Sequence, residues 1–226
     1  MRFLKDLFGI FYPNLCLNCE NNLFHNEKTL CVNCKNELPI IKDKLFNTPF
    51  FLANNNLQDF VSFLYYRKDN ITQKIIHELK YYDREDVGDF LGNWFSYELS
   101  NSKRFTDIDY VIPVPLHKKK LKKRGYNQVS SFAKSLAKNL NSNYNEGKLV
   151  RVSNSKTQTK KSRFDRYSES SSKFKLIDTA FFENKHVLLV DDVITTGATI
   201  ESCINALNAT KDIKISVATM AYTSKD

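Results

Sequence analysis

Apolar residues recur at two spacings along the chain, and these spacings predict alternating strands and helices in its carboxyl-terminal part. A period of about 3.6 residues predicts helices over residues 71–82, 86–99, 126–140 and 199–207. Short apolar or aromatic runs predict strands over residues 60–67, 186–190 and 213–220, and a further short strand in "DYVIPVP". A continuous run such as "VLLV" suits a strand that is buried on both faces. We therefore expect an α/β fold with a mostly parallel sheet flanked by helices.

The composition is typical of a folded chain, and the net charge limits the chemical classes of its possible partners. The chain has 226 residues, of which 42% are hydrophobic and 26% charged, so it is long enough for one ordinary domain and a small accessory module. A formal net charge of +9 favours polyanionic partners, namely phosphate esters, nucleic acid or an acidic surface. Charge alone does not choose among these three.

The sequence offers no sign of a membrane span or an export signal. No apolar run approaches the roughly 18 residues that a bilayer span requires. The opening "MRFLKDLFGIFYP" has helical apolar spacing but no small-residue cleavage site, so we interpret it as a short helix that docks on the core. The alternative is an anchor on a membrane surface. We expect a cytoplasmic protein.

Four of the five cysteines form two pairs of C-x2-C spacing, Cys16 with Cys19 and Cys31 with Cys34. Each pair can direct two thiolates at one ion, and two pairs supply the four sulfurs of a tetrahedral zinc site. Two disulfides would be unusual in a reducing cytoplasm, and an iron–sulfur cluster remains an alternative. Because four thiolates fill the zinc shell, we expect a structural role for the ion.

Two adjacent carboxylates follow the apolar strand in "HVLLVDDVITTGAT". Ligands of open α/β sheets bind at the carboxyl ends of strands, where Asp191 and Asp192 could accept hydrogen bonds from sugar hydroxyls or help hold a cation. The turn that contains Gly197 opens the next helix, and free N–H groups at a helix start bind phosphate. Together these features suit a ribose 5-phosphate, although the two acids could also belong to a solvated turn or a helix cap.

A second basic segment follows the strand in "DYVIPVP". It holds six Lys and Arg residues between positions 118 and 124, and we expect it to be a loop. The backbone of Leu116, His117 and Lys118 could present N–H groups to a diphosphate, and Arg124 could add a fork of donors. The other lysines could contact DNA phosphates or form a solvated face.

The thirteen residues from Val187 to Thr199 resemble the 5-phosphoribosyl-1-pyrophosphate (PRPP) signature of type I phosphoribosyltransferases. The four cysteines, "PVPL", "RGYNQ" and "LLVDDVITTGAT", in this order, resemble the ComF family of competence-associated bacterial proteins, in which a zinc module is fused to a phosphoribosyltransferase-like domain. The resemblance implies an amino-terminal helix and zinc module in residues 1–45. It implies a second domain in residues 46–226, with a PRPP-binding core from about residue 105.

The resemblance also assigns roles to residues. It implies a catalytic pair, Asp191 and Asp192, and a structural zinc ion on the four cysteines, with Mg²⁺ accompanying PRPP. The expected 5-phosphate loop is Thr195, Thr196, Gly197, Ala198 and Thr199. The expected pyrophosphate loop is Leu116, His117, Lys118 and Arg124. The expected mobile hood over the ligand contains Arg151, Gln158, Arg163 and Arg166.

Three functions remain open from the sequence. The first is an enzyme that displaces pyrophosphate from Mg-PRPP with an acceptor that the sequence does not announce. The second is a non-catalytic PRPP-responsive factor that binds single-stranded DNA or scaffolds competence-machinery proteins during DNA uptake. The third, a zinc-ribbon nucleic-acid binder with a vestigial fold, is disfavoured because both acids and the glycine turn are present.

Overall fold

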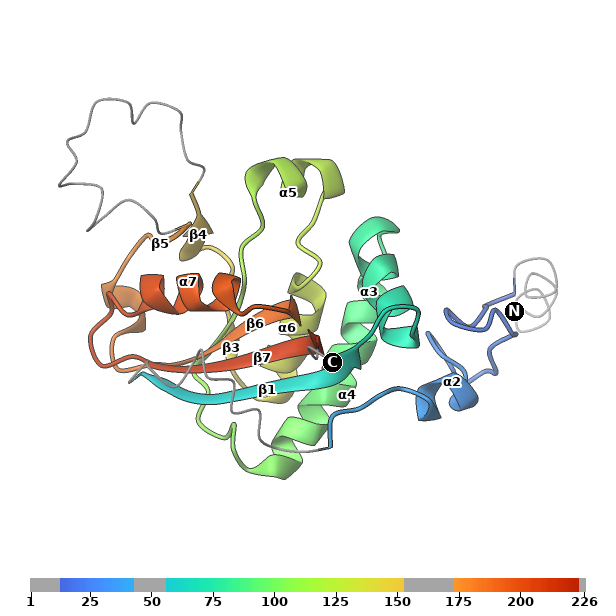
Figure 1. Cartoon of the computed structure of the whole chain (residues 1–226). Coiled ribbons are helices and arrows are strands. Elements are labelled where there is room, and N and C mark those ends of the chain that lie inside the picture. The colour runs from blue at the N-terminus through green and yellow to red at the C-terminus, as the bar shows by residue number, and fades with distance from the viewer. Residues whose placement is uncertain (1–12, 43–55, 153–172, 224–226) are drawn as a thin grey trace, which may run out of the picture.

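The computed structural model describes residues 13–42, 56–152 and 173–223 (Figure 1). The expected amino-terminal helix, the boundary between residues 45 and 46, and the expected hood residues Gln158, Arg163 and Arg166 lie outside the described residues. Among the helices of the described segments, none combines the length and apolar character needed to cross a bilayer.

A parallel sheet forms the centre of the described structure (Figure 1). Its strand order is β1-β7-β6-β2-β3, and every neighbouring pair is parallel. The strands are β1 (Leu57–Tyr66), β2 (Tyr110–Pro113), β3 (Asn143–Tyr144), β6 (His186–Ile194) and β7 (Lys214–Thr223). A separate antiparallel pair joins β4 (Leu149–Arg151) to β5 (Phe174–Leu176). The expectation of a mostly parallel sheet flanked by helices is confirmed.

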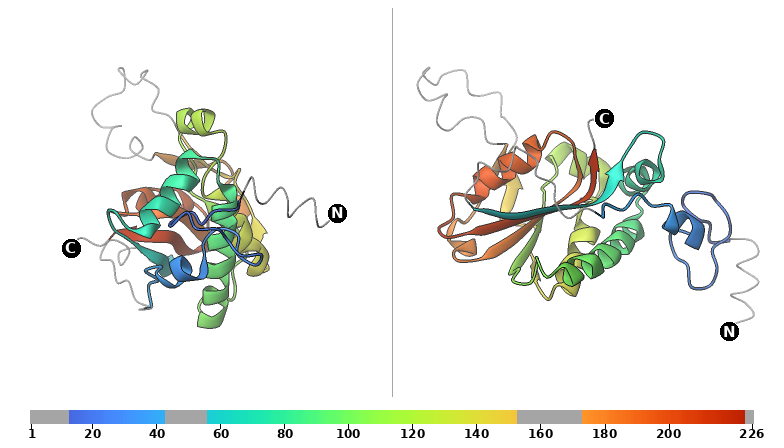
Figure 2. Two further views of the ribbon diagram at one scale, coloured as in Figure 1. Left: turned by 90° about the vertical axis from the view of Figure 1, so that its right-hand side faces the viewer. Right: turned by 60° about the horizontal axis from the view of Figure 1, so that its bottom comes forward.

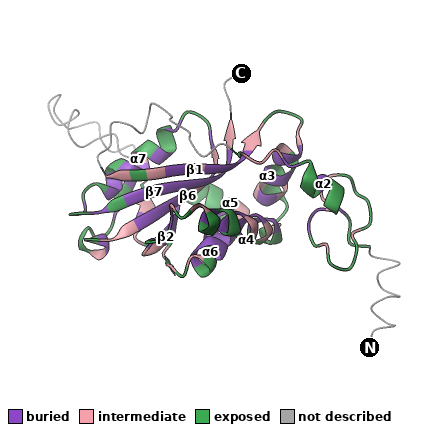
Figure 3. Cartoon of the chain, turned by 90° about the horizontal axis from the view of Figure 1, so that it is seen from below, coloured by how far each residue is buried: buried purple, intermediate pink, exposed green. Residues whose placement is uncertain are grey.

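Helices cover both faces of the sheet (Figure 2). The bounds of the four that pack around it are α3 (Ile71–Tyr81), α4 (Glu85–Ser102), α6 (Ser130–Asn139) and α7 (Ala198–Leu207). On β6, Leu188 and Val190 join the core cluster that contains α3, α4 and α6, whereas Val187 and Leu189 join the cluster that contains α7. All four side chains are fully buried, and Figure 3 shows the middle of the sheet largely in purple. A strand that is covered on both faces explains the continuous apolar run of the sequence.

The structure differs from the sequence-based expectation in three elements that matter for function. The lysine-rich segment is a helix, α5 (Lys118–Arg124), and not a loop. Lysine, arginine and leucine are good helix formers, the His117 side chain accepts a hydrogen bond from the first turn, and Gly125 ends the helix at a φ of 84°. In addition, β6 continues beyond residue 190 as far as Ile194, so both acids lie within the strand. The expected helix over residues 126–140 begins later, at Ser130.

Close packing of α4 against α6 fixes the start of α6, from which the site is built. A Cβ atom placed on Gly92 of α4 would lie 2.8 Å from the Phe132 carbonyl oxygen and 2.7 Å from the Ser135 Cβ. Only a residue without a side chain allows this approach between the two helices.

The four-cysteine segment lies beside the sheet and is joined to it by the backbone. It contains α2 (Val32–Asn36), and the chain that leaves it runs along the free edge of β1. There the Ile41 N–H donates to the Phe63 carbonyl at 2.9 Å, and the Tyr65 N–H donates to the Pro39 carbonyl at 2.9 Å. The segment also contacts the helices, since Lys74 Nζ of α3 donates to the Asn18 carbonyl and Lys35 Nζ lies 4.6 Å from the ring centroid of Trp94 on α4.

Candidate functional site

The connections that follow β2 and β6 leave the sheet in opposite directions. The two strands are hydrogen-bonded neighbours, with Pro113 opposite Val190. After β2 the chain passes through α5 and α6 to β3, on the side away from β6, whereas after β6 it passes through α7 to β7 on the other side. The carboxyl ends of β2 and β6 therefore form a topological switch point, the place where open α/β sheets bind ligands. Both expected phosphate-binding segments begin there.

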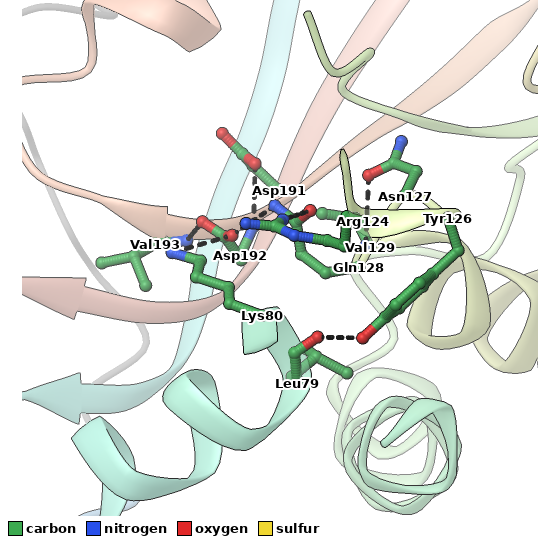
Figure 4. A network of polar contacts seen from close by, with 10 residues as sticks. All are labelled: Leu79, Lys80, Arg124, Tyr126, Asn127, Gln128, Val129, Asp191, Asp192 and Val193. Atoms are coloured by element: carbon green, nitrogen blue, oxygen red, sulfur yellow. Dashed lines mark hydrogen bonds and ion pairs between the residues drawn. The ribbon is translucent and has the colours of Figure 1, made fainter. Parts of the chain in front are cut away.

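Asp191 and Asp192 point toward opposite faces of the sheet, because successive side chains of a strand alternate (Figure 4). Asp192 lies on the face of α3 and α6 and is 7% exposed. Asp191 is partly buried on the other face, and its charge acts on the buried thiol of Cys203 in α7. In addition, the backbone N–H of Asp192 donates a 2.9 Å hydrogen bond to Asp191 Oδ1.

A chain of polar contacts joins Asp192 to the basic helix (Figure 4). Gln128 Nε2 donates to Asp192 Oδ2 at 2.7 Å, and the side-chain oxygen Oε1 of Gln128 accepts from Arg124. Lys80 Nζ of α3 lies 3.0 Å from the same Asp192 oxygen. We call Arg124, Gln128, Asp192 and Lys80 the polar chain. It brings together two residues that the sequence singled out separately, Arg124 and Asp192.

Lys80 and Gln128 were not identified as site residues from the sequence. Lys80 is one of 34 basic residues and has no distinguishing local pattern. Gln128 belongs to the "RGYNQ" motif, and this motif was the feature of the sequence from which Gln128 could have been identified as a site residue. Its position is set by Asn127, whose side-chain amide donates to the Val114 carbonyl at 3.1 Å and whose side-chain oxygen accepts from the Val129 N–H.

The electrostatic setting of Asp191 favours its neutral form. Burial and, after it, the neighbouring Asp192 carboxylate raise the pKa of Asp191 to about 8, although the Asp192 N–H and the positive charges of Lys80 and Arg151 oppose the shift. Arg151, an expected hood residue, thus lies within electrostatic reach of Asp191 from β4, where its guanidinium is 5.4 Å from the Phe174 ring centroid. An added cation or hydrogen-bond donor at this carboxyl would favour its ionisation.

The expected 5-phosphate loop forms an exposed turn that opens α7. Gly197 has a φ of 78°, which L-residues with side chains rarely adopt, and it is buried directly before the helix. Thr195, Thr196, Ala198 and Thr199 are exposed. The first backbone hydrogen bond of the helix is that from the Glu201 N–H to the Gly197 carbonyl, so the earlier N–H groups of the turn lie at the positive end of the helix dipole. This arrangement suits an anion.

The expected pyrophosphate residues occupy the start and end of α5. Leu116 and His117 are half-buried ahead of the helix, and His117 Nδ1 accepts from the Lys119 N–H at 3.2 Å. Lys118 is exposed, whereas Arg124 turns back toward Gln128. Figure 1 shows α5 projecting from the carboxyl end of the sheet. Because the segment is helical, the cationic side chains and not a loop of N–H groups dominate this surface.

The two cysteine pairs converge on one point. The sulfur atoms of Cys16, Cys19, Cys31 and Cys34 all lie within 4.8 Å of one another. A tetrahedral zinc ion with Zn–S bonds of about 2.3 Å would separate its sulfurs by about 3.8 Å, so the four atoms can share one ion after small adjustments. Although burial opposes ionisation of the Cys16 thiol, backbone N–H donors lower its pKa to about 6, whereas burial and the neighbouring thiols raise the pKa of Cys34 to about 12.

Comparison with known proteins identifies a domain in the carboxyl-terminal part of the chain. Residues 129–225 match the model of the phosphoribosyl transferase domain. The chain is 28% identical to the DNA utilization protein YhgH of Escherichia coli O157:H7 over 129 residues, which cover 56% of each chain. It is 36% identical to competence protein F of Haemophilus influenzae over 91 residues, 40% of each chain. The alignments thus span about half the length of these curated relatives.

Solved structures of phosphoribosyltransferases are also similar. Glutamine PRPP amidotransferase from B. subtilis, complexed with ADP and GMP, is 21% identical, with a TM-score of 0.43, and the match covers 62% of this chain and 30% of that one. A hypoxanthine phosphoribosyltransferase from Staphylococcus aureus is 16% identical, with a TM-score of 0.37 and coverage of 63% and 75%. The chain thus carries a phosphoribosyl transferase domain in its carboxyl-terminal part, is similar to relatives named DNA utilization protein YhgH and competence protein F, and has a four-cysteine cluster ahead of the sheet.

Proposed function

We propose that the chain binds Mg-PRPP at the carboxyl ends of β2 and β6. The observation that carries the proposal is the switch point, where an acid pair, a glycine turn at a helix start and a cationic helix all meet at adjacent strand ends. The phosphoribosyl transferase domain match supports the same ligand class. The site is therefore suited to one sugar that carries a phosphate at one end and a pyrophosphate at the other.

The residues divide according to the parts of PRPP. The turn from Thr195 to Thr199 receives the 5-phosphate, because its exposed hydroxyls and N–H groups are donors. Asp191 and Asp192 receive the ribose hydroxyls from either side of the strand, and Arg124, with the start of α5, receives the pyrophosphate. Carboxylate and phosphate oxygens are good ligands for Mg²⁺. A bound Mg²⁺ would neutralise part of the negative charge of the pyrophosphate.

Calorimetric titration of PRPP in the presence of Mg²⁺ tests the site. Loss of a charge-assisted hydrogen bond costs about 1.5–3 kcal/mol, so Asp191→Ala and Asp192→Ala should each weaken binding roughly 10- to 150-fold. Asp107→Ala is the matched control, because Asp107 is an exposed aspartate that precedes β2 at the opposite end of the sheet. Wild-type affinity in both site variants would exclude this binding mode.

The proposal extends to catalysis, namely the turnover of PRPP. Transfer of the phosphoribosyl group to an acceptor would release pyrophosphate, and the cations of α5 would stabilise the leaving group. A pyrophosphate-release assay with a panel of nucleobases and amines separates the two cases. Release that depends on one acceptor identifies a transferase, whereas PRPP binding without release identifies a PRPP-responsive binding protein.

The biological setting that we propose is DNA uptake during natural transformation, in the cytoplasm. The relatives named competence protein F and DNA utilization protein support this setting. Reduced thiols in that compartment would keep the four cysteines available for zinc, which we propose as their ligand. Competence-machinery proteins would be the partners of the zinc module.

The exposed cations of α5 favour a second candidate function, the binding of single-stranded DNA. The helix carries Lys or Arg at six of its seven positions, and none of its residues is buried. A helix with this composition presents positive charge to a phosphate backbone without reading its sequence. Titration with single-stranded DNA at two salt concentrations tests it, because phosphate contacts give a steep loss of affinity as salt rises.

A further inference from the structure

The carboxyl-terminal end of α3 presents three aromatic rings to solvent. Tyr81 is 65% exposed and Tyr82 is 60% exposed, and His77 is exposed one turn earlier. The ring centroid of His77 lies 4.8 Å from that of Tyr81 and 5.6 Å from that of Tyr82. We call these three residues the aromatic surface. A single exposed tyrosine needs no explanation, but a cluster of neighbouring exposed rings indicates a contact surface.

The aromatic surface adjoins the polar chain and α5. Lys80, which bonds Asp192, immediately precedes Tyr81 in the chain, and the Arg124 guanidinium carbon lies 5.7 Å from the Tyr81 ring centroid. The Tyr126 hydroxyl donates to the Leu79 carbonyl and so ties the segment after α5 to the end of α3 (Figure 4). Rings, guanidinium and lysines therefore belong to one continuous surface beside the candidate PRPP site.

This combination matches the chemistry of one kind of polyanion. Lysines alone suffice for any phosphate-rich partner, including duplex DNA. Exposed rings add stacking energy only where bases are unstacked and accessible, as they are in a single strand. An acidic protein partner would complement α5 equally well but would gain nothing specific from three rings. The surface thus favours a single-stranded nucleic acid over duplex DNA or an acidic peptide.

We infer that the aromatic surface is a base-stacking site for single-stranded nucleic acid, whose phosphates run along α5. The inference rests on the second candidate function, the binding of single-stranded DNA. It assigns Tyr81 and Tyr82 as stacking residues and places the bound strand next to Lys80 and Asp192. The strand and PRPP would then occupy neighbouring positions at the carboxyl end of the sheet.

Two oligomers of equal length separate stacking from phosphate binding. Fluorescence anisotropy compares labelled oligothymidylate with an oligomer of abasic nucleotides, which has the same phosphates but no bases. The full chain should bind oligothymidylate about 5- to 150-fold more tightly, the range expected for stacking of one base. The Tyr81→Ala/Tyr82→Ala double variant should abolish this preference and leave abasic binding unchanged, whereas the Tyr81→Phe/Tyr82→Phe variant should keep it.

Tyr97→Ala provides the matched control, since Tyr97 is a 67% exposed tyrosine on α4. Equal affinity of the full chain for both oligomers would overturn the stacking site while leaving phosphate binding by α5 intact. A preference that survives in the Tyr81→Ala/Tyr82→Ala variant would also overturn it. Failure to bind either oligomer would overturn both the stacking site and the proposed binding of single-stranded DNA. The proposed binding of Mg-PRPP would be unaffected, because calorimetry with PRPP tests it separately.

Discussion

Lys80 Nζ on α3 lies 3.0 Å from Asp192 Oδ2 on β6 and thereby pairs a helix outside the matched domain segment with the acid pair (Figure 4). The Asp192 side chain is only 10% exposed and that of Lys80 is 26% exposed. A poorly solvated carboxylate needs a counter-ion or a hydrogen-bond donor. Helix α3 therefore stabilises the Asp192 carboxylate directly, through Lys80.

Removal of the Lys80 charge should therefore destabilise the fold. In Lys80→Met, Asp192 keeps the hydrogen bond from Gln128 but loses its counter-ion, and we expect the free energy of unfolding to fall by about 1–3 kcal/mol. Urea unfolding at pH 7 measures the change, with the exposed Lys68→Met as control. The loss should be smaller when Asp192→Asn is already present. Equal losses in both backgrounds would show that the pair contributes nothing.

The raised pKa of Asp191 predicts a dependence of stability on pH. With a pKa of about 8 in the folded chain and about 3.9 in the unfolded chain, the folded state holds the extra proton between these values, so this group makes stability decrease as pH rises from about 4 to 8. Asp191→Asn removes the effect. Its stability relative to the original chain should increase from pH 5 to pH 8 and then level off. Urea unfolding across this range provides the measurement, with Asp107→Asn as control. A constant difference at all pH values would contradict the assigned burial of Asp191.

Zinc removal should loosen α3 as well as the four-cysteine segment. The segment contacts α3 through Lys74 and α4 through Lys35, so its unfolding removes support from both helices. Metal analysis should find one zinc per chain, and chelation should lower the melting temperature and weaken PRPP binding. Cys19→Ser should lose the ion, whereas Cys203→Ala, which changes the buried cysteine of α7, should retain it. A metal-free chain with unchanged melting temperature would refute the structural role.

The close approach of α4 to α6 predicts a specific cost for a single methyl group. Gly92→Ala would force its Cβ against backbone and side-chain atoms of α6, so we expect a loss of about 1–3 kcal/mol in the free energy of unfolding despite the better helix propensity of alanine. Gly147→Ala is the control, since nothing lies within 4 Å of a Cβ at that position. Thermal and urea unfolding measure both variants. Equal stability of Gly92→Ala and the control would contradict the prediction. It would mean that α4 and α6 can move apart without a loss in the free energy of unfolding.

Local patterns in the sequence carried a large part of the fold and of the site. The 3.6-residue period predicted α3, α4, α6 and α7, and the double C-x2-C spacing predicted the sulfur cluster, because each pattern acts within a few turns of chain. The helix α5 was missed because the proline-rich strand end and the resemblance to a pyrophosphate loop both indicated a loop, although lysine is a good helix former when its side chains stay in solvent. The short strands β3, β4 and β5 were also not predicted, since two or three residues carry no periodicity.

By itself the sequence determined which residues are chemically equipped for a phosphorylated sugar, a metal ion and a polyanion. Only the tertiary structure decided how they are grouped. Strand order made the ends of β2 and β6 a switch point, and the pleat sent Asp191 and Asp192 to opposite faces. The packing of α3 brought Lys80 to Asp192 from a distant part of the chain. Long-range pairing and packing leave no local pattern, because their energy depends on residues that become neighbours only when the chain folds.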